Sequence, residues 1–444
     1  MRAIHDASEL RPLAIPLRGT EADFDAVVAA ARDKRYVLIG EASHGTHEFY
    51  RSRAEITKRL IRDHGFCAVA IEGDWPDAYR VHRYVCGTST QDQGPADALG
   101  GFKRFPTWMW RNADVLEFVA WLHAYNRDLP PAARVGFYGL DLYSMFASIQ
   151  AVVEYLERVD PEAAERAKER YACFDRFGTD TESYAYAVGS ALTSSCRRDV
   201  LEQLLEMQRA ALAPNASDLE DERRFVAEQN ARVVASAEEY YRTMLDAEVS
   251  SWNQRDTFMF GTLKRLSAHR ERRDAGPAKI VVWAHNSHVG DARATTLGGG
   301  RELNVGQLVR QEYPLTCYSL GFTTSSGTVT AASNWHEHAE RKVVRPPLPG
   351  SWEALFHAVG ISRFFLDLKE AAFQCDVLRG RLLERAIGVI YRPETEFYSH
   401  YFEARISEQF DAIIHYDATR AVQPLEPGAV WQTGEAPETF PSGV

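Results

Sequence analysis

Three ionisable side chains lie close together in one short segment of the chain. In "LIGEASHGTHEFY", residues 38–50, an apolar run stops at Gly40 and is followed by Glu41, His44 and His47. A neutral imidazole can take a proton from water near pH 7, and a nearby carboxylate can orient the ring and fix its tautomer. The segment therefore predicts general-base chemistry, with His44 as the base and Glu41 as its partner. His47 is expected to be a first-turn helix residue that faces the same space.

The position of His44 relative to the following helix supports this assignment. The helix is expected to begin near Thr46. The positive end of its dipole disfavours an imidazolium ion and keeps the ring neutral. Free N–H groups at the same helix start are expected to stabilise a developing oxyanion. Gly40 and Gly45 frame the loop and permit close approach of another backbone segment.

Three further apolar runs also end in ionisable side chains. Glu72 and Asp74 follow "CAVAI", Asp141 ends "VGFYGL", and His285 and His288 follow "VVWA". Any one of these acids, taken alone, is about as well explained as a helix cap. In parallel sheets, however, ligands bind beyond the carboxyl ends of the strands. If the strands are parallel neighbours, all of these side chains converge with His44 on one crevice.

Other residues are candidates for supporting roles. Arg53 could pair with the buried acids, and Arg51 is the competing choice because helical phase does not separate the two. In "WNQRD", Asn253 and Arg255 could hold a substrate carbonyl or orient the carboxylates, although a charged helix surface explains them equally well. Trp75 could line an apolar substrate cleft, but aromatic residues more often belong to the core.

The histidine pair at 285–288 allows two interpretations. Two histidines three residues apart on a helix face one side and could hold a metal ion, or they could supply a hydrogen-bond donor or an acid. The chain has no H-E-x-x-H pattern, so the zinc signal is modest. "HEH" at 336–338 is better explained as a solvated loop.

Short β-rich runs alternate with helical stretches along the chain, which predicts an α/β fold with a mostly parallel central sheet flanked by helices. The expected strands lie at 36–40, 67–71, 134–140, 279–284, 316–322, 387–391 and 410–416. Apolar periodicity predicts crossover helices over 48–63 and 112–128.

A long stretch, residues 145–277, is predicted to be a helical insertion, with segments at 145–158, 161–172, 185–212 and 219–270. Residues 323–351 are expected to form a long loop that acts as a lid or binding loop. The insertion and the core together are expected to make one domain over 1–425. A poorly ordered tail is expected over 426–444.

Composition limits the classes of partner. The chain has 444 residues, a formal net charge of -11 and no basic block, which argues against nucleic acid. No segment approaches the roughly 20 apolar residues of a membrane span, so a cytoplasmic protein is expected. The six cysteines show no C-x-x-C spacing, which predicts a reducing compartment and no disulfide framework. Oligomeric state is left open.

Several motifs together resemble the erythromycin esterase family. These are "GEASHGTHEF", "IEGDWPDAYRVHRYVCG", "YGLDLYS", "WNQRD", "VVWAHNSHVGD" and "FDAIIHYDATRAVQPL", which occur in that family in the same order, from about residue 20 to 425. The resemblance implies an α/β core with a large helical portion and an esterase-type hydrolase. The best-known members of the family open the lactone of macrolide antibiotics. His44 matches the family's general base, and its other active-site positions correspond to Glu41, Arg53, His285 and His288. It also implies a reaction without a bound metal, another cofactor or a covalent acyl-enzyme.

Three hypotheses follow. The first is metal-independent hydrolysis of a small-molecule ester or lactone, in which His44 activates water, Glu41 positions His44, and Arg53 or the helix N–H groups stabilise the oxyanion. His285 and His288 are expected to help polarise the carbonyl or to protonate the leaving alkoxide. No G-x-S-x-G elbow follows a strand, so Ser43 and Ser287 are weak candidates for a nucleophile. The second uses the same carboxylates and histidines to hold a divalent metal that lowers the pKa of water. The third is a binding protein without hydrolytic activity.

Overall fold

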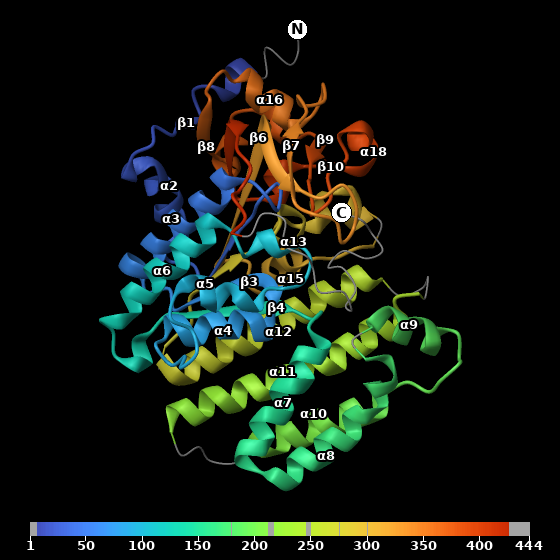
Figure 1. Cartoon of the computed structure of the whole chain (residues 1–444). Coiled ribbons are helices and arrows are strands. Elements are labelled where there is room, and N and C mark those ends of the chain that lie inside the picture. The colour runs from blue at the N-terminus through green and yellow to red at the C-terminus, as the bar shows by residue number, and fades with distance from the viewer. Residues whose placement is uncertain are drawn as a thin grey trace.

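Parallel strands form the middle of a nine-stranded sheet in the computed structural model (Figure 1), which describes residues 7–178, 180–211, 217–245, 250–274, 276–299 and 301–425. The strand order is β1-β8-β11-β6-β2-β5-β3-β4, and β7 pairs with β6. Strands β11 to β4 in this order are parallel, whereas β1, β8 and β7 pair antiparallel. The predicted α/β fold with a mostly parallel sheet is therefore confirmed. The strands are β1 (Ile15–Pro16), β2 (Tyr36–Ile39), β3 (Ala68–Asp74), β4 (Gly136–Asp141), β5 (Ile280–Trp283), β6 (Cys317–Ala331), β7 (Glu340–Val344), β8 (Arg363–Asp367) and β11 (Ala412–Thr419).

Both faces of the central strands are buried, which is why their sequences are almost continuously apolar. Alternate residues belong to different cores: Val37 and Ile39 pack in one, and Tyr36 and Leu38 in the other. The first core lies against α2 (Asp25–Ala31), α3 (His47–His64) and α6 (Ala113–Arg127), and the second lies against α12 (Ser251–Asp274) and the helices around it.

The register of the sheet brings the expected site residues to one edge. Ile39 of β2 and Ile71 of β3 both pair with Trp283 of β5. Glu72 directly follows Ile71 in β3. Glu41 comes two residues after Ile39, and His285 comes two residues after Trp283. The four strands predicted to be parallel neighbours are consecutive, in the order β2-β5-β3-β4, so their carboxyl ends meet at one place.

The insertion after β4 is helical, as predicted, and its helices gather at the bottom of the view in Figure 1. They are α7 (Met145–Val159), α8 (Pro161–Tyr171), α9 (Thr181–Gly189), α10 (Arg197–Ala211), α11 (Asp218–Thr243) and α12. The segments expected at 185–212 and 219–270 are each divided between two helices. The remaining helices are α4 (Trp75–Val85), α5 (Pro95–Ala98), α13 (Asn286–Val289), α14 (Thr296–Gly299), α15 (Val305–Glu312), α16 (Trp352–Ala358), α17 (Leu368–Ala371), α18 (Glu396–Ser399) and α19 (Ile406–Gln409).

Two predictions for the C-terminal half were wrong. Residues 323–351 do not form a long loop, because β6 continues to Ala331 and is followed by β7. The run 387–391 is not a strand of the sheet. It makes single bridges instead, of which Ser43 with Ile387 is one. Both segments are rich in β-forming residues, and sequence periodicity does not reveal which backbone they pair with. A two-stranded sheet of β9 (Leu382–Arg385) and β10 (Tyr401–Ala404) was not foreseen.

The cysteine prediction also needs correction. A disulfide joins Cys173 to Cys196 within the helical insertion, across a sequence separation of 23 residues. Spacing rules recognise close cysteine pairs, so this pair carried no signal. None of the helices in the described ranges combines the length and hydropathy needed to span a bilayer. The tail predicted over 426–444 lies outside the described residues.

Candidate active site

Close backbone packing shapes the loop that carries His44. A Cβ at Gly40 would lie 2.2 Å from Oδ1 of Asn286, and one at Gly45 would lie 1.9 Å from the carbonyl oxygen of Thr330. Both glycines are therefore required by close approach, as the sequence predicted. The backbone N–H of Asn286 donates to the carbonyl of Glu41 at 2.8 Å, which ties the loop after β2 to the loop after β5.

His44 lies at the end of a chain of three buried polar groups. Its Nδ1 is 3.0 Å from Oε1 of Glu41, and the other oxygen of Glu41 accepts a hydrogen bond from Arg53 at 3.0 Å. All three side chains are at most 2% exposed. Because a carboxylate can only accept, Nδ1 of His44 carries the hydrogen of this contact, and in the neutral form of the ring Nε2 presents a lone pair. Arg51 is exposed, so the structure favours Arg53 over Arg51.

The ring of His285 faces the ring of His44. Their centroids are 4.8 Å apart. Nδ1 of His285 accepts a hydrogen bond from the backbone N–H of Ser287 at 3.2 Å, so the hydrogen lies on Nε2. This Nε2 makes no well-formed hydrogen bond with the described residues, although the nearby carbonyl of Ala42 acts on the ring. Burial, and then the neighbouring His44, lower the pKa of His285 well below its ordinary value. His285 is thus a neutral donor beside the lone pair of His44.

Glu72 connects the histidines. Its Oε2 accepts the backbone N–H of His285 at 2.7 Å. Its Oε1 lies 2.9 Å from Arg255, 3.3 Å from Nε2 of His288 and 3.9 Å from Nε2 of His44. Burial alone would raise the pKa of Glu72, but His288, His44 and Arg255 hold this pKa well below its usual range. Glu72 is therefore an anion at neutral pH.

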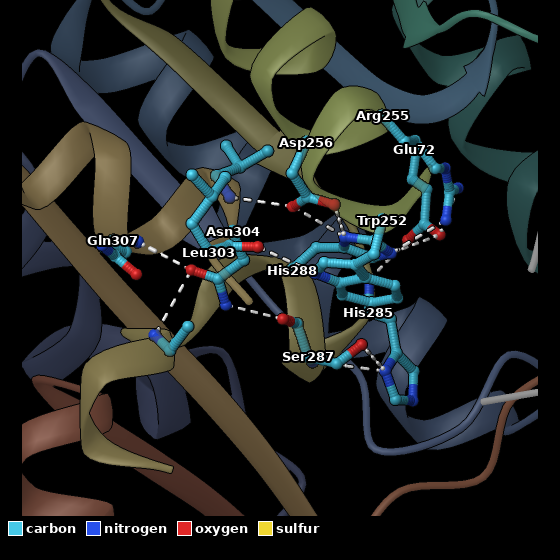
Figure 2. A network of polar contacts seen from close by, with 12 residues as sticks. Glu72, Trp252, Arg255, Asp256, His285, Ser287, His288, Leu303, Asn304 and Gln307 are labelled. Atoms are coloured by element: carbon cyan, nitrogen blue, oxygen red, sulfur yellow. Dashed lines mark hydrogen bonds and ion pairs between the residues drawn. The ribbon is translucent and has the colours of Figure 1, made fainter. Parts of the chain in front are cut away.

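His288 is surrounded by groups from α12 (Figure 2). Its Nδ1 is 2.9 Å from Oδ1 of Asp256, and its ring stacks on Trp252 with centroids 4.4 Å apart. Burial and the guanidinium of Arg255, whose Nη1 lies 3.0 Å from Nε2, oppose charge on the ring, but Asp256 and Glu72 outweigh them and raise the pKa of His288 to about 9. The short segment 285–288 thus carries two imidazoles with opposite pKa shifts, a pair that can supply a neutral hydrogen-bond donor and a cation to the same cluster.

We expect NMR of histidine-labelled protein to show that His288 titrates near pH 9. Replacing Asp256 by asparagine should lower that pKa, because the variant removes the carboxylate with the largest raising effect. His82 is a matched control, since burial lowers its pKa to about 4 and Asp256 is not among the causes of that shift. An unchanged His288 titration in Asp256→Asn would contradict this description.

Linkage fixes the sign of the accompanying stability change. The folded-state pKa of His288 exceeds the ordinary value of about 6.5. Its contribution to the free energy of unfolding is therefore complete below about pH 6.5 and disappears as the pH rises through 9.

Arg255 neutralises two carboxylates from different strands. It contacts Asp141 through two nitrogens, at 3.1 and 2.6 Å, and Glu72 at 2.9 Å. The guanidinium ion of Arg255 therefore compensates the charge of both buried carboxylates. No three histidine, cysteine or acidic side chains in the described ranges are grouped so as to hold a metal ion.

The structure brings together most, but not all, of the residues predicted from sequence. The cluster contains Glu41, His44, Arg53, Glu72, Asp141, Arg255, His285 and His288, each at most 2% exposed. Asp74 lies at its border and pairs with Arg104 at 2.6 Å, and burial raises its pKa.

Two predicted supporting residues lie elsewhere. Asn253 bonds the backbone of the 301–303 loop, through Arg301 and Leu303. Trp75 is a core residue that stacks on Tyr138. Large aromatic side chains follow buried strands for packing reasons as often as for binding, so the sequence signal for Trp75 was ambiguous.

Some of the N–H groups expected to bind an oxyanion near the start of α3 are already bonded within the protein. The N–H of His47 donates to the carbonyl of Arg420, and the N–H of His44 donates to Ile387. The side chain of His47 pairs with Asp114 at 2.9 Å rather than with the cluster. Sequence reasoning could not foresee these partners, because they are distant in the chain.

Asp256, which stands beside Arg255 in "WNQRD", and Trp252, a possible cleft residue, were not assigned to the site from the sequence, although both contact His288. Their spacing relative to Arg255 indicates that they belong to the same site. Trp252, Arg255 and Asp256 stand at i, i+3 and i+4, which places them on one face of α12. A search for residues that share a helix face with Arg255 would have found them.

Comparison with known proteins gives a consistent result. The sequence profile of the family described as Erythromycin esterase matches residues 61–419. YbfO of Bacillus subtilis (strain 168), whose name assigns it provisionally to the hydrolases, is 22% identical over 86% of this chain and 83% of that protein. Erythromycin esterase type II of Escherichia coli is 20% identical over 89% of this chain and 92% of that protein.

Solved structures share the fold. A Bacillus cereus protein has a TM-score of 0.74 at 20% identity, covering 96% of this chain and 99% of that one. A succinoglycan biosynthesis protein has a TM-score of 0.72 at 19% identity, covering 94% and 98%. A mutant of the erythromycin esterase EreC, in its open conformation, has a TM-score of 0.63 at 17% identity, covering 91% and 95%.

Proposed function

Because the chain belongs to the erythromycin esterase family, we propose that it hydrolyses a carboxylic ester, either open-chain or a lactone, by direct attack of water. The observation that supports this most strongly is the buried series Arg53–Glu41–His44, whose outer nitrogen, Nε2 of His44, lies between His285 and the carboxylate of Glu72. The known activity of the family's named member, erythromycin esterase, adds macrolide lactones to the substrates to test.

The proposed reaction begins with proton transfer to His44. Nε2 of His44 takes a proton from water as the water oxygen bonds to the ester carbonyl carbon. Glu41 stabilises the imidazolium that forms, and Arg53 keeps Glu41 ionised and in place. When the tetrahedral intermediate collapses, the carbon–alkoxide bond breaks and His44 returns the proton to the leaving oxygen.

His285 is positioned to stabilise the negative charge of the intermediate. Its Nε2–H is a neutral donor, so it can bond the developing oxyanion without giving up its proton. We therefore assign the stabilisation of the oxyanion to His285, and not to the helix N–H groups or Arg53 that the sequence suggested. His288, held in the cationic form by Asp256 and Glu72, adds positive charge to the same pocket.

The direct test is turnover by purified protein on a panel of open-chain esters, simple lactones and macrolides, with and without chelator. We expect hydrolysis of at least one class and no loss with chelator. Stoichiometric tightly bound metal, together with loss of turnover on its removal, would support the metal-dependent alternative instead.

We expect Ser43→Ala to keep turnover within about threefold of wild type, because Ser43 bonds the side chain of Thr46 rather than His44. Intact-protein mass spectrometry during turnover should show no acyl adduct. An adduct that disappears in Ser43→Ala or Ser287→Ala would replace the water mechanism with an acyl-enzyme.

A further inference from the structure

A large hollow lies between three helices next to the candidate active site. It has a volume of about 830 Å³ and is lined by one face each of α4, α7 and α11. The lining positions 147, 150, 151, 154 and 158 on α7 follow helical spacing, as do 219, 223, 226, 227 and 230 on α11. α4 and α7 directly follow β3 and β4, so the hollow opens beside the strand ends that carry Glu72 and Asp141. We call it the α4–α7–α11 groove.

The groove is positively charged, although the chain has a formal net charge of -11. Two acidic residues line it, Asp77 and Glu154. Six basic residues do so: Arg80, Arg83, Lys103, Arg104, Arg158 and Arg223.

Part of this charge is not neutralised by the protein. Arg80 is paired with Asp92 at 2.7 Å, and Arg104 with Asp74. Arg83, Lys103 and Arg158 have no carboxylate within salt-bridge distance among the described residues. Positive charge gathered in a concave surface attracts anions, because the low-dielectric walls focus the field.

The groove is separated from the active site by a single layer of side chains. Arg104 lines the groove and lies 5.3 Å from the ring centroid of Tyr143. Arg255 of the active site lies at the same distance from that ring. Asp74, which pairs with Arg104, lies opposite Asp141 on the neighbouring strand. Asp141 in turn pairs with Arg255. A ligand in the groove would therefore need only this layer to shift in order to reach Glu72 and His288.

The lining of the groove also contains a buried hydrogen-bond acceptor that a polar ligand could satisfy. The side chain of Asn230 is 1% exposed and lines the groove. Its Nδ2 donates to the carbonyl of Val226, but its Oδ1 has no hydrogen-bond donor among the described residues. A buried acceptor without a donor is costly, and a ligand hydroxyl or N–H would remove that cost.

We propose that the α4–α7–α11 groove binds the non-reacting part of the substrate, and that this part carries an anionic carboxylate or phosphate group. The inference rests on the proposed ester hydrolysis and adds a substrate class to it. Arg83, Lys103 and Arg158 supply the positive charge that attracts the anion, and the layer of Arg104, Asp74 and Tyr143 separates the groove from the reacting ester.

Binding can be measured without turnover in the His44→Ala background. The probes are the mono-4-nitrophenyl ester of octanedioic acid, which is an anion, and 4-nitrophenyl octanoate, which is neutral and equally long. Titration calorimetry at low salt is expected to show about tenfold tighter binding of the anion. The preference should shrink as salt is added. Competition by inorganic phosphate and by acetate distinguishes a phosphate site from a carboxylate site.

Two triple variants that lose the same net charge test whether the preference for the anionic ester depends on the groove. Arg83→Gln, Lys103→Gln and Arg158→Gln together should abolish the preference for the anion. The control changes three exposed arginines far from the groove, Arg62, Arg127 and Arg198, to glutamine; their side chains are 60, 74 and 87% exposed. It alters the net charge equally and should keep the preference.

The outcomes separate the two proposals. Equal affinity for the two esters, or a preference lost equally in both triple variants, would overturn the groove assignment whether or not the enzyme turns over esters. Groove-dependent binding of the anion, with no hydrolysis of any ester by the wild type, would contradict the proposed function and still support an anion site.

Discussion

Replacing His44 by alanine is expected to lower kcat by about 10²–10⁴-fold, the usual contribution of a general base. The fold should persist, because Glu41 keeps its hydrogen bond from Arg53 and the variant removes only one of its two side-chain partners. The loss of stability should be about 1–2 kcal/mol, measured by urea unfolding. Initial rates on the best ester from the panel give kcat and KM separately, and we expect the effect in kcat.

His47 provides a matched control on the same loop. It lies three residues after His44 but pairs with Asp114, outside the cluster. His47→Ala should therefore retain turnover close to wild type. If His47→Ala were inactive and His44→Ala active, the assignment of the base would be wrong.

Replacing Arg255 by methionine should have the largest effect on stability. The side chain is 1% exposed and neutralises Glu72 and Asp141, which are both fully buried. Removing one partner of a buried ion pair leaves uncompensated charge and typically costs about 3–5 kcal/mol. We expect a loss of this size in the free energy of unfolding at pH 7. Arg127→Met, which breaks only an exposed contact with Asp128, should cost less than about 0.5 kcal/mol.

The pH dependence of this loss identifies its cause. In the wild type the pKa of Glu72 lies well below its usual range, so its contribution to stability is present above the unfolded pKa and is lost only as the pH falls through the folded pKa. In Arg255→Met that pKa must rise, because one cation is gone. The difference in stability between wild type and variant should therefore be largest at pH 7 and smaller at pH 5. A loss that does not depend on pH would indicate disrupted packing rather than unpaired charge.

The cluster of candidate catalytic residues is closed to solvent. His44, His285 and Glu72 are at most 2% exposed, so no ester reaches them in the conformation described here. The helical insertion supplies Arg255, Asp256 and Trp252, and α11 of the same insertion lines the α4–α7–α11 groove. The same insertion therefore supplies part of the cluster and part of the wall of the groove.

Sequence reasoning succeeded where the physical constraint was local or periodic. Strands buried on both faces require nearly unbroken apolar runs, so β2, β3, β4 and β5 were recognisable. It failed for β7 and for 387–391, whose character depends on which distant backbone supplies the hydrogen bonds. Periodicity reports the faces of an element and not its neighbours.

The sequence by itself determined which side chains follow the apolar runs of the buried strands, because residues buried on both faces of a sheet must be apolar and the end of such a run is visible in the sequence. It also determined that Gly40 and Gly45 leave room beside His44. Only the tertiary structure decided the charge and tautomer of each group. His44 and His47 are chemically identical, yet one meets Glu41 and Glu72 while the other meets Asp114. His285 and His288 are three residues apart, yet burial keeps one neutral and Asp256 makes the other a cation. These differences arise from partners as far as 213 residues away in the chain, as between Glu72 and His285, and from complete removal of water, neither of which is encoded in local spacing.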